Sequence, residues 1–352
     1  MNITHADVLV LGLGPAGACA AAQAAREGCN VIAIERKHVA GVPVQCAEFV
    51  PAMIGMDVAE LHASVRQRIA SMTTFVEQDD PDVQENFPGH MLDRAAFDAA
   101  LARQARDAGA QCEFGVSARA ISAGGVVKLS DGRAIHPRVI VGADGPRSIA
   151  GRAIGQRNTE LIETRQITVP LHRAHDATDI FLSADIPGGY GWLFPKGDVA
   201  NLGAGVAPEY KRQLKRIVNG LHQTLIERGQ VGAPVLGMTG GLIPAGGMLK
   251  PRGMLANIVV LLAGDAAGLT NPVTGAGISA AVQSGRLAGR AAAATLRGDA
   301  SAPADYEEAL DDVFGAALAR AQRRRAALAA TRRDKDALRQ GWIAYPQYWA
   351  PQ

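Results

Sequence analysis

The sequence has few aromatic residues, few cysteines and almost no net charge. Phe, Trp and Tyr make up only 5% of its 352 residues, so the core must be packed mostly by Ala, Leu, Val and Ile. The four cysteines show no C-x-x-C pair and no metal-ligand spacing, so we expect no metal. A formal net charge of +2 gives no reason to expect nucleic acid as a partner.

The sequence also shows no long apolar run and no targeting segment. Its most apolar run, residues 258–263, is far shorter than the roughly 20 residues that span a bilayer. The N-terminus has no charged region followed by an apolar stretch, so we expect no secretory signal. We therefore expect a reduced, cytoplasmic protein.

Glycine, in contrast, is abundant, with 40 residues that cluster in particular loops. The first cluster has the spacing G-x-G-x-x-G and lies between an apolar strand at 6–11 and an Ala-rich helix that begins at Pro15. A pyrophosphate can approach the backbone of such a turn and bind the free N–H groups of the helix. A carboxylate ends the next strand, where it can accept hydrogen bonds from a ribose diol. The dinucleotide-binding residues expected here are Gly12, Gly14, Pro15, Ala16, Gly17, Glu35 and Arg36.

Further glycine-rich turns distinguish FAD from NAD. A strand at 139–141 leads into Gly142-Ala143-Asp144-Gly145, and the strand at 258–263 leads into Gly264-Asp265. Asp265 can bind a ribityl hydroxyl, and N–H groups of the loop at 275–277 can face the flavin pyrimidine ring. A nicotinamide dehydrogenase needs neither segment, so the pattern predicts FAD. The residues expected to bind it are Asp144, Gly264, Asp265, Pro272, Gly275, Ala276, Gly277 and Ile278.

Three of the scarce aromatic residues alternate along one strand, in Tyr190-Gly191-Trp192-Leu193-Phe194-Pro195. Alternate residues of a strand share one face, so Tyr190, Trp192 and Phe194 present three rings to the same side. These rings either bind an apolar substrate or form a locally aromatic core.

The order of these segments resembles that of p-hydroxybenzoate-hydroxylase-type flavoproteins, and most closely that of the geranylgeranyl reductase family. The Y-x-W-x-F-P run followed by Gly203-Ala204-Gly205 is similar to a pattern thought to line the lipid cavity in that family. Monooxygenases of the superfamily more often have His and Asn where Gly268 and Ser279 stand here. The resemblance implies an α/β (α+β) fold, with a Rossmann-like FAD domain of GR2 type and an inserted antiparallel-sheet substrate domain.

The expected organisation is discontinuous. Residues 1–75, 90–158 and 250–300 are assigned to the FAD domain, 76–89 and 159–249 to the substrate domain, and 301–352 to a C-terminal helical region with an aromatic tail. Within the first domain we expect a helix over 91–108, capped by Asp93, and a hairpin over 116–133 with its turn at 130–132.

Residues 43–48 contain the candidate catalytic groups. The resemblance implies that Cys46 lies near the flavin, where its thiol can protonate a carbanion, although a small apolar filler is an equal alternative. Glu48 departs from the family's usual glycine and can act as an acid or base if it is buried. Arg94 either binds FAD or pairs with its neighbours at the start of a helix.

The C-terminal region is amphipathic and basic. An apolar face that includes Tyr306 and Leu310 is followed by arginines at 320, 323–325, 332 and 333. Such a helix is more often solvated on its charged face, but it can contact a membrane or an acidic partner. The rings of Trp342, Tyr345, Tyr348 and Trp349 can cover the substrate pocket or bind a partner.

These patterns favour an FAD-dependent reductase that acts on a hydrophobic substrate such as an isoprenoid chain. Its electron donor would be NAD(P)H or a reduced carrier protein, since no separate nicotinamide domain is evident. One alternative is a flavin monooxygenase that hydroxylates an aromatic small molecule or a peptide-borne aromatic side chain. A second is a non-catalytic FAD subunit for electron transfer or assembly, which predicts no substrate cavity.

Overall fold

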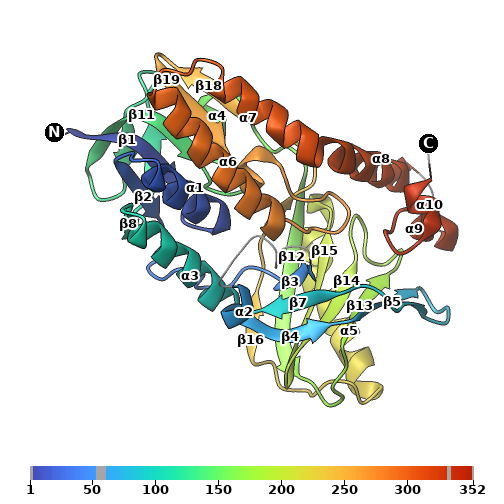
Figure 1. The fold of residues 1–352 in the computed structure, drawn as a ribbon. Coiled ribbons are helices and arrows are strands. Elements are labelled where there is room, and N and C mark those ends of the chain that lie inside the picture. The colour runs from blue at the N-terminus through green and yellow to red at the C-terminus, as the bar shows by residue number, and fades with distance from the viewer. Residues whose placement is uncertain (1–2, 53–60, 331–333, 351–352) are drawn as a thin grey trace.

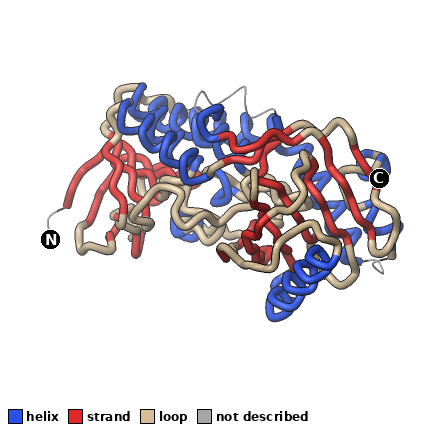
Figure 2. The backbone as a smooth tube through the Cα atoms, turned by 90° about the horizontal axis from the view of Figure 1, so that it is seen from below, coloured by secondary structure: helices blue, strands red, loops and turns tan. Residues whose placement is uncertain are grey.

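The structure is a computed structural model that describes residues 3–52, 61–330 and 334–350. These residues form a mostly parallel sheet near one end of an elongated molecule and a second, mixed sheet toward the other (Figure 1, Figure 2). Helices α7 (Ala302–Leu310) and α8 (Ala316–Ala330) extend from the first sheet toward the second (Figure 1).

The centre of the first sheet is parallel, because its strands are buried on both faces and consist of nearly continuous apolar runs. Its spatial order is β18 (Arg252–Leu255), β19 (Ile258–Leu262), β11 (Ala134–Gly142), β1 (Ile3–Leu11), β2 (Val31–Glu35) and β8 (Gln111–Phe114). Only β18 runs antiparallel within this order, and the antiparallel strands β10 (Val127–Leu129) and β9 (Ala118–Ile121) extend it from β11. The carboxyl ends of β1, β11 and β19 therefore meet at one edge.

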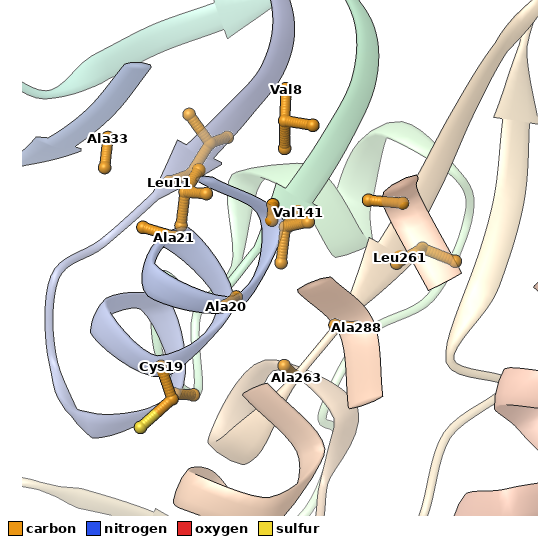
Figure 3. Packing of buried hydrophobic residues seen from close by; sticks show 14 of the residues in the cluster. Val8, Leu11, Cys19, Ala20, Ala21, Ala33, Val141, Leu261, Ala263 and Ala288 are labelled. Carbon is orange, nitrogen blue, oxygen red and sulfur yellow. The ribbon is translucent and has the colours of Figure 1, made fainter. Parts of the chain in front are cut away.

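Small side chains let helices pack closely on this sheet. Helices α1 (Pro15–Arg26) and α6 (Ile278–Leu296) lie side by side, and Figure 3 shows Ala20 of α1 and Ala288 of α6 among the strand residues. A Cβ placed on Gly285 would overlap the carbonyl oxygen of Ala16. The two helix backbones are thus as close as a glycine contact allows.

The second sheet carries buried apolar side chains on both faces. Its order is β16 (Gly237–Thr239), β12 (Leu161–Pro170), β15 (Val199–Val206), β14 (Gly191–Lys196), β13 (Ala177–Leu182), β5 (Ser71–Val76) and β6 (Asp82–Gln84), with β17 (Leu242–Pro244) also paired to β12. Helix α5 (Leu214–Glu227) covers one face, where Leu193 and Leu202 are buried. The other face carries Trp192 and Phe194.

Shorter elements join the two sheets. A small sheet contains β3 (Phe49–Pro51), β7 (Gly89–Leu92) and β4 (Val65–Ile69). The remaining helices are α2 (Leu61–Ser64), α3 (Arg94–Asp107), α4 (Ile149–Ala153), α9 (Lys335–Gln340), α10 (Pro346–Trp349), the 3-10 helices Pro208–Gln213 and Gly264–Ala267, and a π-helical turn at Asp311–Gly315.

The predicted α/β fold is confirmed, with local corrections. The second sheet is mixed, because β5 pairs with β13 in parallel. Strand β5 lies almost wholly within residues 1–75, the segment that the sequence assigned to the FAD domain. The second sheet therefore begins at Ser71. The rest of the domain division stays a prediction. The predicted helix 91–108 begins only at Arg94, because Met91 and Leu92 pair with neighbouring strands in β7. The predicted hairpin 116–133 is the β9–β10 pair, and the turn at 130–132 leads from β10 into β11.

Adding one methyl group at the α1–α6 contact should destabilise the protein. We expect Gly285→Ala to lower the unfolding free energy by about 1–3 kcal/mol, because an overpacked contact forces the helices apart. Differential scanning calorimetry should show a lower Tm. Gly220→Ala is the matched control: no heavy atom lies within 4 Å of the added Cβ in α5, so its Tm should be unchanged or higher. An unchanged Tm for Gly285→Ala would contradict this packing account.

Candidate functional site

Glycine-rich turns converge at the carboxyl edge of the first sheet. Gly12 follows β1 with φ of +91°, and a Cβ there would overlap the carbonyl oxygen of Ala143 in the turn after β11. The N–H of Ala143 donates to the carbonyl of Leu11 at 2.8 Å. Helix α1 begins after Gly14 with no side-chain cap, so its N-terminal N–H groups are available to an anion.

The carboxylate of Glu35 orders this turn. Its Oε2 accepts a hydrogen bond from the N–H of Leu13 at 2.9 Å, and its Oε1 accepts one from the N–H of Lys37, also at 2.9 Å. The side chain ends β2 beside the turn, which is where the sequence pattern placed a ribose-binding acid.

Asp144 and Asp265 occupy the later turns and differ in their partners. The Asp144 carboxylate accepts hydrogen bonds from the Ser148 hydroxyl at 2.5 Å and the Ile149 N–H at 2.6 Å, so it holds the start of α4. The Asp265 carboxylate accepts one hydrogen bond, from the Thr270 hydroxyl at 2.7 Å. Burial raises the pKa of both carboxyls.

The loop before α6 is built by Asn271. Its Oδ1 accepts hydrogen bonds from the N–H groups of Val273 and Thr274, at 2.9 and 3.0 Å. Gly275 then takes a φ of +70°, and α6 begins after Gly277 with no side-chain cap. This loop therefore presents a second uncapped helix N-terminus to the same edge of the sheet.

All these turns open into one cavity of about 800 Å³ between the two sheets. It is lined by the predicted site residues Gly12, Gly14, Pro15, Ala16, Glu35, Arg36, Cys46, Glu48, Arg94, Asp144, Tyr190, Trp192, Phe194, Gly264, Asp265, Gly275, Ala276, Gly277 and Ile278. Gly17 and Pro272 do not line it. A Cβ on Gly17 would overlap the carbonyl oxygen of Gly12, so Gly17 serves the packing of the turn.

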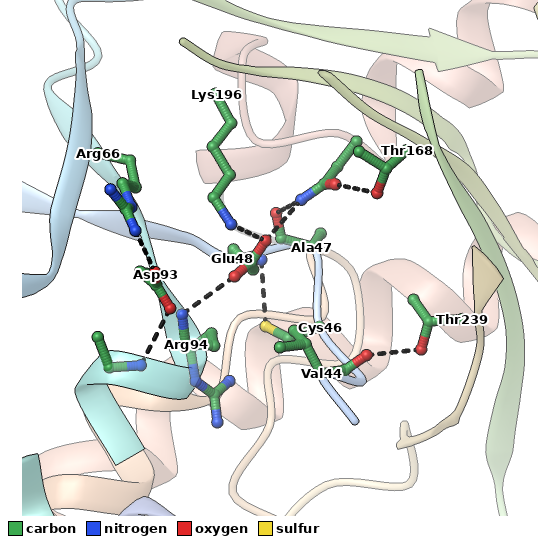
Figure 4. Close-up of polar contacts among 12 residues, drawn as sticks. Val44, Cys46, Ala47, Glu48, Arg66, Asp93, Arg94, Thr168, Lys196 and Thr239 are labelled. Atoms are coloured by element: carbon green, nitrogen blue, oxygen red, sulfur yellow. Dashed lines mark hydrogen bonds and ion pairs between the residues drawn. The ribbon is translucent and has the colours of Figure 1, made fainter. Parts of the chain in front are cut away.

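Cys46 and Glu48 lie in the cavity wall within a dense polar cluster (Figure 4). Glu48 is 4% exposed, and its carboxylate contacts Lys196 at 2.6 Å and Asn201 at 2.9 Å. The Sγ of Cys46 accepts a hydrogen bond from the N–H of Glu48 at 3.2 Å. Sequence reasoning found Cys46 and Glu48 but missed Lys196 and Asn201, which come from other strands.

Arg94 lies beside this cluster. Its guanidinium donates to both carboxylate oxygens of Asp98, at 3.0 and 3.1 Å, and lies near the Cys46 side chain. Burial alone would lower the pKa of Arg94, but Asp98 and Cys46 raise it on balance. The expected cap is present in Asp93, whose carboxylate accepts from the N–H of Ala96.

Aromatic rings form a continuous part of the cavity wall. Ring centroids lie 5.8 Å apart for Tyr190 and Trp192, 6.3 Å for Trp192 and Phe194, and 5.8 Å for Phe194 and Phe49. The Tyr190 hydroxyl donates to the Thr274 carbonyl at 2.5 Å, which ties this wall to the loop before α6. The predicted aromatic face is thus directed into the cavity.

The C-terminal segment adds to this wall. Trp342 is 4% exposed and lies 4.8 Å from Tyr190 between ring centroids, and both Trp342 and Ile343 line the cavity. Helix α9 is held by Asp79, whose carboxylate pairs with Lys335 and with Arg339. Of the four tail rings that the sequence analysis considered, Trp342 lines the pocket, whereas Tyr345, Tyr348 and Trp349 do not.

The shape and donors of the site fit FAD. A Cβ on Gly14 would meet no atom within 4 Å, so the turn leaves open space next to the uncapped start of α1. Carboxylates suited to ribose and ribityl hydroxyls, Glu35 and Asp265, line the same cavity as the uncapped start of α6. Across the sheet edge, in the order β2, β1 and β19, these groups match a ribose diol, a pyrophosphate and a ribityl chain, with the start of α6 left for the flavin ring.

Comparison with known proteins agrees with this geometry. A family model described as the geranylgeranyl reductase catalytic domain matches residues 162–243, and one described as an FAD dependent oxidoreductase matches residues 7–144. Digeranylgeranylglycerophospholipid reductase 2 of Methanopyrus kandleri is 33% identical over 337 residues, covering 88% of this chain and 83% of that protein. Digeranylgeranylglycerophospholipid reductase of Methanocella arvoryzae is also 33% identical, covering 89% and 84%.

Solved structures give the same result. A geranylgeranyl bacteriochlorophyll reductase-like protein from Thermoplasma acidophilum superposes with a TM-score of 0.84 at 25% identity, covering 96% of this chain and 90% of that one. PqsL from P. aeruginosa, solved with 2-aminobenzoylacetate, has a TM-score of 0.71 at 20% identity, covering 95% and 98%, and shares the fold alone. The chain belongs to the geranylgeranyl reductase family of FAD-dependent oxidoreductases.

Proposed function

We propose that this chain reduces carbon–carbon double bonds in the isoprenoid chain of a lipid. The observation that carries the proposal is the aromatic wall, which adjoins the glycine-rich turns in one cavity. Curated relatives that match most of this chain are named for reduction of a digeranylgeranyl lipid. An apolar chain lying against these rings would place its double bonds beside the flavin and exclude water from them.

We assign the FAD contacts to the residues that line the turns. The uncapped start of α1 would bind the pyrophosphate, Glu35 a ribose diol, Asp265 a ribityl hydroxyl, and the start of α6 the pyrimidine ring. In this assignment Asp144 does not bind FAD directly, because its carboxylate already accepts hydrogen bonds from Ser148 and Ile149. Its role is to hold the start of α4 in place. Gly17 and Pro272 do not line the cavity, and we assign them to the support of the turns that do.

Reduced FAD supplies the hydride in this chemistry. Alkene reduction adds that hydride to one carbon and a proton to the other, so a proton donor is required. We assign it to the Cys46 thiol, which lines the cavity and is hydrogen-bonded rather than packed as an apolar filler. The proton lost from Sγ returns from solvent after each turnover.

Electrons must reach FAD from outside the chain. In the described residues, one large sheet carries the FAD turns and the other the ring wall, so neither is left to form a nicotinamide domain. We propose a reduced carrier protein or a transiently bound NAD(P)H as the donor.

We propose no membrane contact for the C-terminal helices α7 and α8. Tyr306 and Leu310 of α7 and Leu318 of α8 are buried in the first core, whereas Val313 between the two helices is 53% exposed. The Arg324 side chain is buried as well and donates to the carbonyls of Tyr348 and Ala350, so its charge holds the tail instead of a solvated face. Residues 331–333, with two of the arginines, lie outside the described part. No helix among the described residues is long and apolar enough to cross a membrane.

The alternatives make different predictions. A non-catalytic FAD subunit would lack a substrate cavity, whereas this chain has one lined by aromatic rings. A monooxygenase acting on a small aromatic molecule or a peptide would give an oxygenated product. Incubation with a geranylgeranyl lipid, dithionite and catalytic protein should instead give a product heavier by two hydrogens per reduced double bond. An unchanged lipid mass under these conditions would contradict the proposed reaction.

Removing the Glu35 carboxylate should weaken FAD binding. Glu35→Ala loses the charge-assisted hydrogen bonds that order the Gly12 turn, so we expect the Kd for FAD to rise about 10- to 100-fold. Titration of the apoprotein by flavin fluorescence measures this. Glu27→Ala, in the same β-α-β unit but outside the cavity, should leave the Kd unchanged. Equal affinities for the two variants would remove Glu35 from the FAD site.

Removing the Cys46 thiol should separate FAD binding from turnover. We expect Cys46→Ala to retain FAD while kcat falls about 100-fold, because the proton donor is lost. Bound-flavin absorbance and lipid product yield are the two measurements. Cys112→Ala, on β8 and outside the cavity, is the control. Turnover like that of the control would exclude Cys46 from the chemistry.

Trp342 should contribute to lipid binding. Trp342→Ala opens the wall beside Tyr190, so we expect KM for the lipid to rise about tenfold through lost ring contact. Trp349→Ala removes a ring that is 57% exposed and outside the cavity, and should leave KM unchanged. Steady-state kinetics over a series of chain lengths checks both variants, and an unchanged KM for Trp342→Ala would show that its ring does not contact the substrate.

A further inference from the structure

Glu48 adopts a left-handed backbone conformation, with φ of +71°. This region is disfavoured for any residue with a Cβ, whereas glycine enters it freely. The resulting turn directs the N–H of Glu48 at the Sγ of Cys46, 3.2 Å away. The contact between Glu48 and the sulfur is therefore made by the backbone and not by the carboxylate.

The carboxylate of Glu48 holds this conformation in place. Its Oε1 accepts a hydrogen bond from the N–H of Arg94 at 3.0 Å, and its Oε2 accepts from Lys196 at 2.6 Å and from Asn201 at 2.9 Å. These donors come from the start of α3 and from strands β14 and β15 (Figure 4). The side chain is only 5% exposed, and both oxygens are occupied by N–H donors.

A cation lies beside the same sulfur. The guanidinium of Arg94 is near the Cys46 side chain and is held by its ion pair with Asp98, at 3.0 Å. Because the backbone N–H of Arg94 is bonded to the Glu48 carboxylate, that carboxylate also fixes the residue that supplies the cation. The N–H donor to Cys46 and the neighbouring cation thus both depend on Glu48.

The backbone around the thiol is tied down by the same group of side chains. The Cys46 carbonyl accepts a hydrogen bond from Gln166 at 3.2 Å, and the Ala47 carbonyl accepts one from Asn201 at 3.3 Å. Asn201 therefore contacts both the turn and the Glu48 carboxylate.

We propose that Glu48 is a positioning residue that holds the Cys46 sulfur against its own N–H and beside the Arg94 guanidinium, and that it exchanges no proton with the substrate. Its oxygens accept hydrogen bonds from three protein groups, on Arg94, Lys196 and Asn201. This inference rests on the proposed function only because that function assigns the proton transfer to Cys46. The position of the sulfur relative to Glu48 does not depend on the proposed function.

Substitution by glycine and by alanine separates this role from acid–base catalysis. Both Glu48→Gly and Glu48→Ala remove the carboxylate, but only glycine keeps the left-handed backbone without strain. We expect kcat to fall about 10- to 100-fold in Glu48→Ala and clearly less in Glu48→Gly, with KM within about twofold of wild type in both. An acid–base role predicts equal losses, and a packing role predicts that alanine is the milder change.

Thiol alkylation provides a readout that does not need the substrate. The Glu48 N–H holds the sulfur at the cavity wall, where a small reagent can reach it, so loss of this contact should slow the reaction of Cys46 with iodoacetamide. At one fixed pH, in the FAD-containing protein, we expect the rates to fall in the order wild type, Glu48→Gly, Glu48→Ala. Mass spectrometry of the Cys46 peptide gives the rate separately from the other cysteines.

Glu77 offers a matched control in the same chain. It also has a left-handed backbone, with φ of +52°, and a carboxylate that accepts from the Ala184 N–H at 2.6 Å and the Ser183 hydroxyl at 2.9 Å, but it lies outside the cavity. Glu77→Ala should alter stability without changing kcat or Cys46 alkylation.

The outcomes are distinct. Equal alkylation rates in Glu48→Gly and Glu48→Ala, a faster rate in Glu48→Ala, or the same effect in Glu77→Ala would each overturn the inference. If no lipid is reduced by wild-type protein, the proposed function fails while the alkylation order still tests the role of Glu48.

Discussion

Backbone contact between neighbouring turns is the constraint on which the site depends. The turn after β1 approaches the turn after β11 so closely that a methyl group on Gly12 would overlap the Ala143 carbonyl. Helix α6 approaches α1 with similar closeness at Gly285. Because these contacts leave no room for side chains, the N-termini of both helices reach the same edge of the sheet, where a long, anionic dinucleotide can bind across them.

The second constraint joins the two sheets across the cavity. The Glu48 carboxylate contacts the start of α3 on the side of the first sheet and Lys196 of β14 in the second. The Tyr190 hydroxyl makes a further link, to the loop before α6. A buried, charge-assisted cluster of this kind is costly to leave half-paired, so it favours one arrangement of the sheets. The thiol of Cys46 and the ring wall are therefore held beside one another in a single, defined space, where Gln166 bonds both the Cys46 carbonyl and the Trp192 indole.

Much of this arrangement could be predicted from the sequence because it is encoded locally. A strand that ends in a glycine turn and a helix places the backbone at Gly12 or Gly264 with few alternatives. Alternation along a strand likewise determines that Trp192 and Phe194 share a face. Turn chemistry and strand period act over a few residues, so a single sequence is enough to recognise them.

Other features depend on contacts between distant segments, and local patterns do not contain them. The helix over 91–108 lost its first turn because Met91 pairs with two other strands. The ion pair between Glu48 and Lys196 spans 148 positions, and the indole of Trp342 reaches the wall from the tail. Arg324 was expected on a solvated face, yet tertiary packing buries it against the last residues of the chain. Because aromatic residues are scarce, their clustering in the sequence was the one feature that indicated contacts between distant segments.

Single-turnover reoxidation of the flavin tests the central claim most directly. The protein would be reduced without oxygen, freed of excess reductant and mixed with a geranylgeranyl lipid in a stopped-flow instrument. The account predicts that lipid alone restores the oxidised flavin spectrum, with one double bond reduced per flavin. Flavin that stays reduced with lipid and is reoxidised only by oxygen, with an oxygenated product, would contradict it.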